Sequence, residues 1–544
     1  MNTLHIDPRI TRRNLLRGGL GLGAFAVLGL AGCSNEGRGG GALATNASVA
    51  LPTYIPFDGI PLDLKGTNGV SDTMLAYPAN PKALTDGPPG DGQDIRALAM
   101  TNTSIPPSVD RNEFWQALNE RLGCSFAVSQ VLAGDFTDRF QTAVAGDQLP
   151  DLFTILSGQV PGLPGLLAER ATDLTDLLSG DAVAKYPFLA NIPTESWKST
   201  VHGGKIYGIP IPRGPVSSQV TYARQDLLEA QGITAQVSSL DDFHALCKEL
   251  TSSSGRWALG QVPRPYLRQM YEVPNGWTEA GGKLVSANEH EGQEAALEAG
   301  RRLVADGLVH PDAFSVEQPQ RKTWLVNGTI TLLDDTFSAW SDFSNFPISE
   351  EFRLAVVPPP LAEGGGTANI WLAGATHNIT SISAKSADRA EALLGVLNYL
   401  AAPFGSAEHL FKNYGIEGVH HELKGTDPVL NDKGRSELQL SLKYLAEGPW
   451  VNFLAGSPDV AQAQYDAQTA TVPTAVRNPT EGLFSETGSR RGPQIGETLM
   501  SVETDIIAGR KPVSAWGPAV QAWKRGGGDK IRDELQKALA ERES

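Results

Sequence analysis

The residues that could do chemistry are few, and their spacing is poor for catalysis. Asp334 and Asp335 are adjacent, and neighbouring strand residues point to opposite faces. A glycosidase instead needs two carboxylates about 5 to 9 Å apart in one cleft. His420, His421 and Glu422 form the densest group of metal-ligand types, but consecutive residues cannot all face one ion. We therefore predict no catalytic residue, no metal, no cofactor and a protein that is not an enzyme.

Nucleotide-binding, metalloprotease and esterase patterns are also missing from the sequence. It contains no G-x-x-x-x-G-K-[ST], no H-E-x-x-H and no G-x-S-x-G. The formal net charge of −16 repels phosphate backbones, which argues against a nucleic-acid partner. Beyond Cys33 only Cys124 and Cys247 remain, so no disulfide-rich scaffold can form, although a bridge between these two stays open.

The first forty residues have the three parts of a bacterial export signal. Four arginines precede an apolar stretch at residues 18–30, and small residues lead from it to Cys33. A helix of that length rises about 20 Å, which is short of the roughly 30 Å core of a bilayer. The run at residues 11–16, TRRNLL, resembles a twin-arginine (Tat) signal, and residues 30–33, LAGC, resemble a lipobox. We predict a signal peptide over 1–32 and an exported, membrane-anchored lipoprotein, acylated at Cys33 in the manner of a palmitate anchor.

The elements that follow alternate between strands and helices. Residues 33–50 are rich in Gly, Ala, Ser and Asn and predict a flexible tether, and the Pro- and Gly-rich residues 51–93 predict an extended segment. A strand is expected from Ile95, then a helix capped by Asp110 and ended by Gly123. Strand and helix patterns continue to residue 156 and recur after Pro215. The fold class expected is α/β, built as two similar units.

Five segments, taken in order, resemble one family. Residues 145–153 read AGDQLPDLF, residues 203–210 read GGKIYGIP, and residues 222–232 read YARQDLLEAQG. Residues 414–420, YGIEGVH, and 523–529, WKRGGGD, complete the set. They are similar to extracellular solute-binding proteins, family 1, of bacterial ABC importers. The nearest branch is that of large oligosaccharide-binding lipoproteins, which includes binders of aldouronates and alginate fragments.

This resemblance implies a periplasmic-binding-protein type II-like fold, with two α/β lobes joined by a hinge that the chain crosses more than once. The first lobe is expected at 94–214 plus 373–425, and the second at 215–372 plus 426–544. The implied function is that of an ABC-transporter substrate-binding lipoprotein. It would capture a carbohydrate, expected to be an oligosaccharide, as a monomer and deliver it to a membrane permease. Some members of the branch carry a calcium loop where residues 251–256, TSSSGR, stand here without a carboxylate, so no calcium is expected there.

Sugar clefts use aromatic rings and hydrogen-bonding side chains, which makes the tryptophans informative. Trp340 follows a strand at the place where related sugar binders have a ligand-facing tryptophan, although a core position stays open for it. Trp277 lies on a turn, which favours a functional role. Arg213 at the first crossing fits either a hinge salt bridge or a carboxylate clamp. The candidate ligand-binding residues are Trp277, Trp340, Trp371, Asp335, Arg213, Asn275, Tyr414 and Trp450.

Two other classes of function stay open. A secreted carbohydrate-active enzyme, a glycoside hydrolase, would need a carboxylate pair in the cleft. A surface binding protein without a transport role would have the same export signal and no permease partner.

Overall fold

The computed structural model describes residues 46–543, apart from 47, 157–159, 254, 344–345, 347–348 and 350. Residues 39–544 form one compact unit. The predicted signal peptide, its Tat and lipobox motifs and Cys33 lie outside the described residues. No helix in the described part of the chain is long and apolar enough to cross a membrane.

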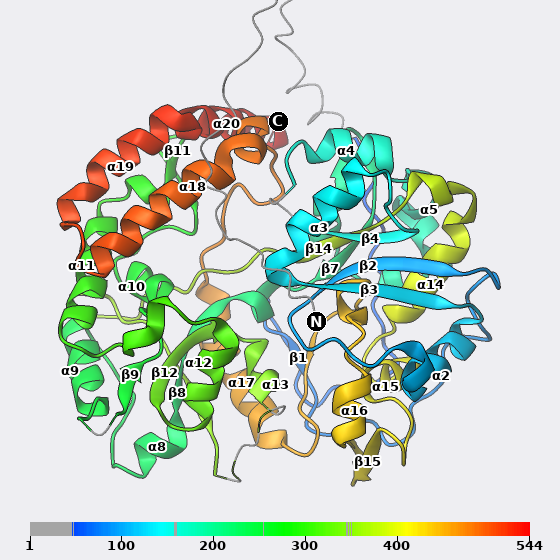
Figure 1. The fold of residues 1–544 in the computed structure, drawn as a ribbon, viewed down its shortest axis with the longest axis horizontal. Helices are drawn as coiled ribbons and strands as arrows, with labels where there is room; N and C mark the ends of the chain where they lie inside the picture. Colours follow the sequence, from blue (N-terminus) through cyan, green and yellow to red (C-terminus); the bar gives the residue numbers. More distant parts are fainter. Residues whose placement is uncertain are drawn as a thin grey trace, which may run out of the picture. The chain divides into compact units, whose positions relative to one another are not determined.

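The first sheet has five strands in the order β3-β2-β4-β14-β7 (Figure 1). The bounds are β2 Ile95–Thr101, β3 Phe126–Leu132, β4 Leu152–Leu156, β14 Thr376–Ile382 and β7 Ile209–Pro212. Strands β3, β2 and β4 run parallel, while β14 is antiparallel to both β4 and β7. Strands that lie hundreds of residues apart in the sequence therefore meet in one sheet.

Alternation along β2 explains the two layers of helices on this sheet. Ile95 and Ala97 pack in the core that contains α2 (Glu113–Leu122) and α14 (Ala390–Leu400), whereas Leu98 and Met100 pack in the core that contains α3 (Ala133–Ala145). Successive strand side chains point to opposite faces, so one apolar strand can serve both layers. The sheet with these helices is the first lobe.

The start of α2 differs from the prediction. Asn112, and not Asp110, caps the helix, because the Asn112 side chain accepts a hydrogen bond from the backbone N–H of Trp115. Asp110 lies in a preceding turn of 3-10 helix at Val109–Arg111. The predicted end is confirmed, since Gly123 follows α2 with φ of 68°, a conformation that glycine adopts without strain.

The second sheet has four strands in the order β13-β8-β12-β9. The bounds are β13 Leu354–Val357, β8 Gln219–Arg224, β12 Ile330–Thr336 and β9 Trp257–Leu259. Strands β12 and β9 run parallel, and β8 is antiparallel to β12 and β13. This sheet with its helices is the second lobe.

Helices from two distant parts of the chain cover the second sheet. They are α9 (Leu240–Leu250), α10 (Arg264–Met270), α11 (Gly292–Ala305), α18 (Glu486–Ile507) and α19 (Trp516–Trp523), and they share one apolar core. As the sequence predicts, Ser239 caps α9, since its hydroxyl accepts from the backbone N–H of Asp242 at 3.1 Å.

The remaining elements are shorter or lie outside the two sheets. The strands are β1 Asp72–Thr73, β5 Val201–His202, β6 Lys205–Ile206, β10 Trp277–Ala280, β11 Lys283–Ser286, β15 His421–Lys424, β16 Asp427–Leu430 and β17 Val451–Asn452. The helices are α4 Leu163–Arg170, α5 Thr175–Leu178, α6 Pro187–Ala190, α7 Thr194–Trp197, α8 Gln225–Glu229, α12 Gln318–Val326, α13 Ala339–Asp342, α15 Ala407–Tyr414, α16 Asp432–Glu437, α17 Pro458–Thr471 and α20 Asp529–Glu543.

The chain passes between the two sheets at several points that lie against one another. The first passage leaves β7 and enters β8, and the return runs from β13 to β14. The backbone N–H of Arg213 on the first passage donates to the carbonyl of Ala375 on the return at 2.9 Å. Leu372, also on the return, donates to Val476 at 2.9 Å. These backbone hydrogen bonds hold the passages together as one hinge region.

The division into lobes at residues 214, 372 and 425 stays a prediction. Packing around the first sheet continues past residue 425, because Leu440, Leu442 and Leu445 belong to the same core as Ile95. Residues beyond the expected crossover therefore lie against the first lobe before the chain reaches α17.

The two cysteines of the described chain belong to different lobes. Cys124 lies in the core beside the first sheet and Cys247 on α9, and both are buried and free. Burial raises the pKa of the Cys124 thiol to about 11.

Candidate functional site

Both sheets present the carboxyl ends of their parallel strands to the hinge region. In the first sheet β2 is followed in the chain by β3 on one side of it and then by β4 on the other, and ligands of such sheets bind outside the carboxyl ends at this switch point between β2 and β4. In the second sheet Thr336, the last residue of β12, pairs with Gln219, the first residue of β8 after the hinge. A ligand near the hinge would therefore meet strand ends from both lobes.

The edge of the first sheet carries a connected polar and aromatic group. Asn102, directly after β2, donates from its amide to the hydroxyl of Tyr444 at 3.0 Å. The Tyr444 ring lies 5.4 Å from the ring of His377, the second residue of β14. Asn378 and Thr380 both donate to the backbone carbonyl of Tyr444, at 2.8 and 3.2 Å. These bonds fix Tyr444 on the strand ends although it is remote from them in sequence.

Two cations belong to the same edge and lack carboxylate partners. The guanidinium of Arg213 lies 6.0 Å from the ring centroid of Trp450, and the ammonium of Lys443 lies 5.3 Å from that of Tyr444. Among the described residues no Asp or Glu forms an ion pair with either cation. Burial lowers the pKa of His377, and the charges of Arg213 and Lys443 lower it further, so both cations act on one imidazole.

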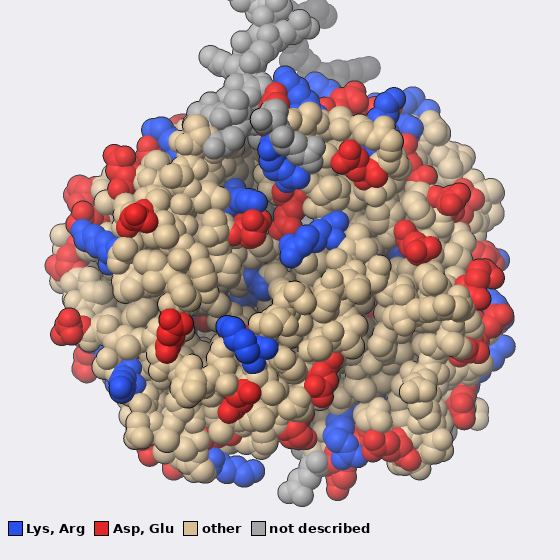
Figure 2. Space-filling view, turned by 180° about the vertical axis from the view of Figure 1, so that it is seen from behind, with Lys and Arg blue, Asp and Glu red and all other residues tan. Residues whose placement is uncertain are grey.

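Unpaired cations at one edge are unusual in a chain with a net charge of −16. Figure 2 shows several Lys and Arg side chains along a hollow in the middle of one face, with some Asp and Glu side chains beside them and more over the outer parts of that face. A positive region inside an acidic surface attracts an anionic group to one place.

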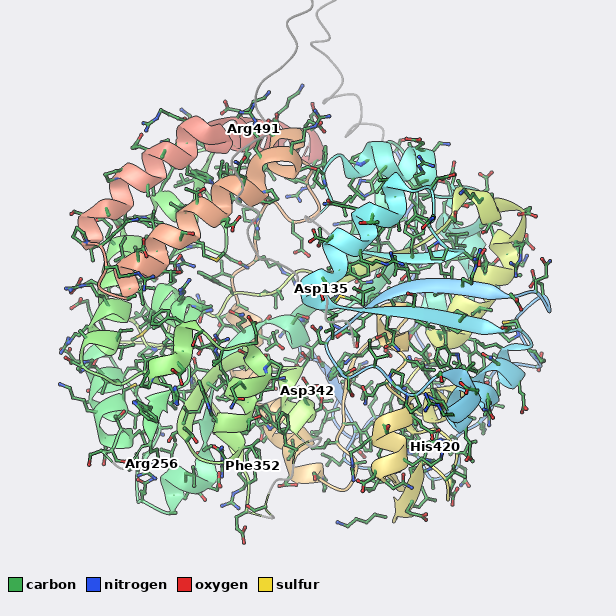
Figure 3. All side chains as sticks on the ribbon, in the orientation of Figure 1. Asp135, Arg256, Asp342, Phe352, His420 and Arg491 are labelled. Carbon is green, nitrogen blue, oxygen red and sulfur yellow. The ribbon has the colours of Figure 1, made fainter. Side chains whose placement is uncertain are left out.

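The edge of the second sheet holds the predicted residue Asp335. Its carboxylate accepts a hydrogen bond from the Gln318 amide at 2.9 Å and lies 3.5 Å from the Lys322 ammonium. Lys322 also pairs with Asp342 of α13 at 2.8 Å (Figure 3). Asp334 takes the opposite face of β12, where Thr221 donates to it at 2.6 Å. The two adjacent carboxylates thus face different surroundings, as strand alternation predicts.

Of the two roles left open for Trp340, the structure supports the core. Its side chain is 4% exposed and packs edge-on against Tyr222, with 5.3 Å between ring centroids. The short helix α13 begins just after β12 and turns the indole back onto the sheet. The burial of Trp340 favours the core position, and a role in ligand binding stays a prediction.

Three other predicted residues hold the framework around the hinge. Asn275 donates from its amide to the carbonyls of Leu372 and Val476, at 2.8 and 3.0 Å. The indole of Trp371 donates to the carbonyl of Val273 at 2.9 Å. Half-buried Trp277 starts β10 and lies 6.3 Å from Trp523. The contacts of Asn275 and Trp371 join the return passage to the second lobe, whereas Trp277 packs within that lobe.

Tyr414 lies apart from the strand ends. It is the last residue of α15, and its ring packs against that of Tyr77 at 5.8 Å. Burial raises its pKa. The structure therefore brings Arg213 and Trp450 together, places Asn275 and Trp371 in the hinge framework, and separates Tyr414 from both groups.

Sequence reasoning missed four residues of the first edge, namely Asn102, His377, Lys443 and Tyr444. Asn102 carried a usable signal, because it is a polar residue directly after a buried strand. Lys443 and Tyr444 carried none, since only the return of the chain after residue 425 brings them to this edge.

Known proteins resemble this chain over most of its length. No family model matches it. Lipoprotein LipO of Bacillus subtilis (strain 168) is 22% identical over 477 residues, covering 82% of this chain and 92% of LipO. The polygalacturonan/rhamnogalacturonan-binding protein YtcQ of the same organism is 21% identical over 420 residues, covering 74% and 83%.

Several solved structures share the fold. The alginate-binding protein AlgQ2, in a structure without calcium ion, has a TM-score of 0.60 at 13% identity, covering 84% of this chain and 99% of AlgQ2. The N-glycan transport solute binding protein NgtS of Streptococcus pneumoniae has a TM-score of 0.61 at 17% identity, covering 83% and 99%. FusA of Streptococcus pneumoniae, in complex with kestose, has a TM-score of 0.60 at 15% identity, covering 82% and 99%.

These similarities confirm two predictions. The fold is the two-lobed α/β fold of the periplasmic-type solute-binding proteins. The resemblance to lipoprotein and carbohydrate-binding members of that group, indicated by five short segments, extends over most of the chain. The structural neighbours are binding proteins rather than enzymes.

Proposed function

We propose that this protein is the substrate-binding lipoprotein of an ABC importer, which captures an oligosaccharide between its lobes and delivers it to a membrane permease. The observation that carries the proposal is the meeting of strand ends from both sheets at the hinge, with hydrogen-bonding and aromatic side chains on them. The similarity to YtcQ and to the sugar-binding structures supports a carbohydrate as the ligand.

The proposed mechanism is capture by closure. A sugar offers hydroxyl groups that both donate and accept, and apolar C–H faces that stack on rings. A ligand that contacts both sheet edges favours the arrangement in which the lobes are together, because only then are both sets of contacts made. The permease would recognise that arrangement.

Arg213 and Lys443 favour a ligand that carries a carboxylate. A guanidinium donates two parallel hydrogen bonds to a carboxylate, and neither cation forms an ion pair with an Asp or Glu among the described residues. The sugar ring beside this carboxylate would lie near Trp450 and Tyr444. One relative is named for polygalacturonan and one structural neighbour for alginate, both of which are polyuronates.

The location of the protein in the cell is part of the same proposal. Residues 1–32 would direct export by the Tat route, and acylated Cys33 would hold the protein at the outer face of the membrane beside its permease. The lipoprotein relative LipO supports this location. We expect a monomer, since one copy supplies both lobes.

Ligand binding tests the central proposal. The exported chain with Cys33→Ser would be screened by thermal shift against trigalacturonate, galactotriose, xylotriose, mannotriose and cellotriose. A ligand at about 100 times its Kd adds about 2.7 kcal/mol of stability. If no saccharide raises the melting temperature while peptides or other solutes do, the carbohydrate proposal is wrong. If the bound sugar is recovered as shorter products, the protein is a hydrolase.

The anchor needs its own experiment. Cells fed with labelled palmitate should yield labelled protein in the membrane fraction, and Cys33→Ser should remove the label and release the protein. Membrane retention of the Cys33→Ser variant would contradict the proposed anchor.

A further inference from the structure

The second lobe contains a small, mainly apolar pocket beside the hinge, with a few polar side chains on its wall. It lies between α10 and the hinge end of the sheet, and Thr221, Asp334, Tyr266 and Gln269 line it. Strand alternation places Asp334 on the same face as Leu332, which packs in the core with α10. Ile370 of the return passage also lines the pocket, which therefore adjoins the region where the lobes are joined.

Asp334 is a buried carboxyl group without a cation. It is 6% exposed, its carboxylate accepts a hydrogen bond from the Thr221 hydroxyl, and no Lys, Arg or His in the described chain forms an ion pair with it. Burial raises its pKa to about 7, and the neighbouring Asp335 charge adds to this. Buried carboxyl groups without a counter-charge are costly, and such perturbed groups concentrate at functional sites.

Gln269 is a buried amide that lacks an acceptor. It is 3% exposed, and its Nε2 has no hydrogen-bond partner among the described residues. Tyr266 does not supply one, since its hydroxyl donates to the carbonyl of Pro358 at 3.2 Å. Buried polar groups in folded proteins are nearly always paired, so the missing acceptor requires an explanation.

A hydroxyl group would satisfy both side chains at once, because it accepts through its oxygen and donates its proton. The pocket is also open to the ligand side, since exposed Gln219, the first residue of β8 after the hinge, lines it. We propose that Asp334 and Gln269 form a subsite for one neutral hydroxyl group of the carbohydrate, with Gln269 donating and Asp334 accepting. This inference rests on the proposed function.

The subsite would also orient the ligand. A carboxylate would be disfavoured there, because a buried charge needs a cation and none among the described residues pairs with Asp334, whereas Arg213 and Lys443 attract a carboxylate at the first lobe. The ligand would therefore bind with a neutral ring in the second lobe and its anionic ring at the first.

Calorimetry on the exported chain with Cys33→Ser tests the subsite, with whichever of the five trisaccharides above binds most tightly as the probe. Gln269→Leu and Asp334→Asn should each weaken binding by roughly 10-fold or more. The control is Thr331→Val, on the same strand. Thr331 is 1% exposed and its hydroxyl also lacks a partner, but it does not line the pocket. It should change Kd by less than about 2-fold.

Monodeoxy forms of the same probe identify the hydroxyl directly. One deoxy form should bind the wild type roughly 10-fold more weakly, yet bind Gln269→Leu no more weakly than the parent sugar does. If Gln269→Leu and Asp334→Asn change the melting temperature but leave Kd unchanged, the pocket holds a structural water and the subsite is refuted while the proposed function stands. If no saccharide binds the wild type, both fail.

Discussion

Asp334→Asn should change how the stability of the protein depends on pH. In the folded chain burial raises the pKa of this carboxyl from 3.8 to about 7. Between these values the unfolded chain has lost the proton and the folded chain keeps it. Stability therefore falls as the pH rises through this window, because the folded state binds one proton more. Above pH 7 both states are ionised and the loss is complete.

The size of the effect follows from the size of the shift. A pKa difference of roughly 3 units, at about 1.4 kcal/mol each, corresponds to about 4 kcal/mol between pH 4 and pH 7. Asparagine keeps the shape of the side chain and can accept from Thr221, but it does not titrate. The variant should therefore lose this part of the pH dependence. Its free energy of unfolding should rise relative to that of the wild type as the pH rises.

Urea unfolding followed by tryptophan fluorescence, in steps from pH 4 to pH 8, measures this difference. Asp335→Asn is the matched control, since that residue is adjacent on β12 but faces Lys322 instead of the pocket. Its profile should keep most of the wild-type slope assigned to Asp334 and lose only the smaller part that the Asp335 charge contributes to the raised pKa. Parallel profiles for wild type and Asp334→Asn over the whole range would refute the assignment of a buried, uncompensated carboxyl.

Three further substitutions separate binding from folding. Trp340→Ala should cost about 3 to 5 kcal/mol in urea unfolding, as expected for a core residue, and weakened ligand binding at unchanged stability would restore its role as a platform. Ser489→Ala removes the hydroxyl of α18 that accepts from the backbone N–H of Gly162 in the first lobe at 2.8 Å, so small-angle scattering should show a more open average form. An unchanged profile would mean that this bond does not hold the lobes. Arg213→Gln should weaken binding of trigalacturonate about 10-fold while Lys283→Gln, an exposed charge on β11, does not, and equal effects would argue against a carboxylate at Arg213.

The sequence predicted helix ends correctly where they depend on interactions between residues close in the sequence. Ser239 caps α9 and Gly123 ends α2, since both act on backbone groups within a few residues. The cap of α2 was misassigned to Asp110 because Asn112, two residues on, offers the same chemistry. Which of two nearby caps is used depends on the packing of Phe114 and Leu118 into the first core.

The candidate site was predictable only in part. Arg213 could be named because a strand, a short connection and another strand mark the first passage. Both roles stayed open for Trp340 in the sequence, since a tryptophan after a strand can turn toward solvent or back onto the sheet, and only the direction of α13 decides between them. The pocket of Asp334 and Gln269 joins residues from a strand and a helix that share no local pattern.

The sequence by itself determined the alternation of strands and helices, the acidic charge and the family resemblance, and it alone carries the prediction of an export signal, because each depends on residue types over short distances. The tertiary structure decided which side chains meet. Two sheets assembled from distant segments bring Lys443 beside His377 and Gln269 beside Asp334. Whether a polar side chain is paired, buried or free to bind a ligand depends on those neighbours, and long-range packing alone supplies them.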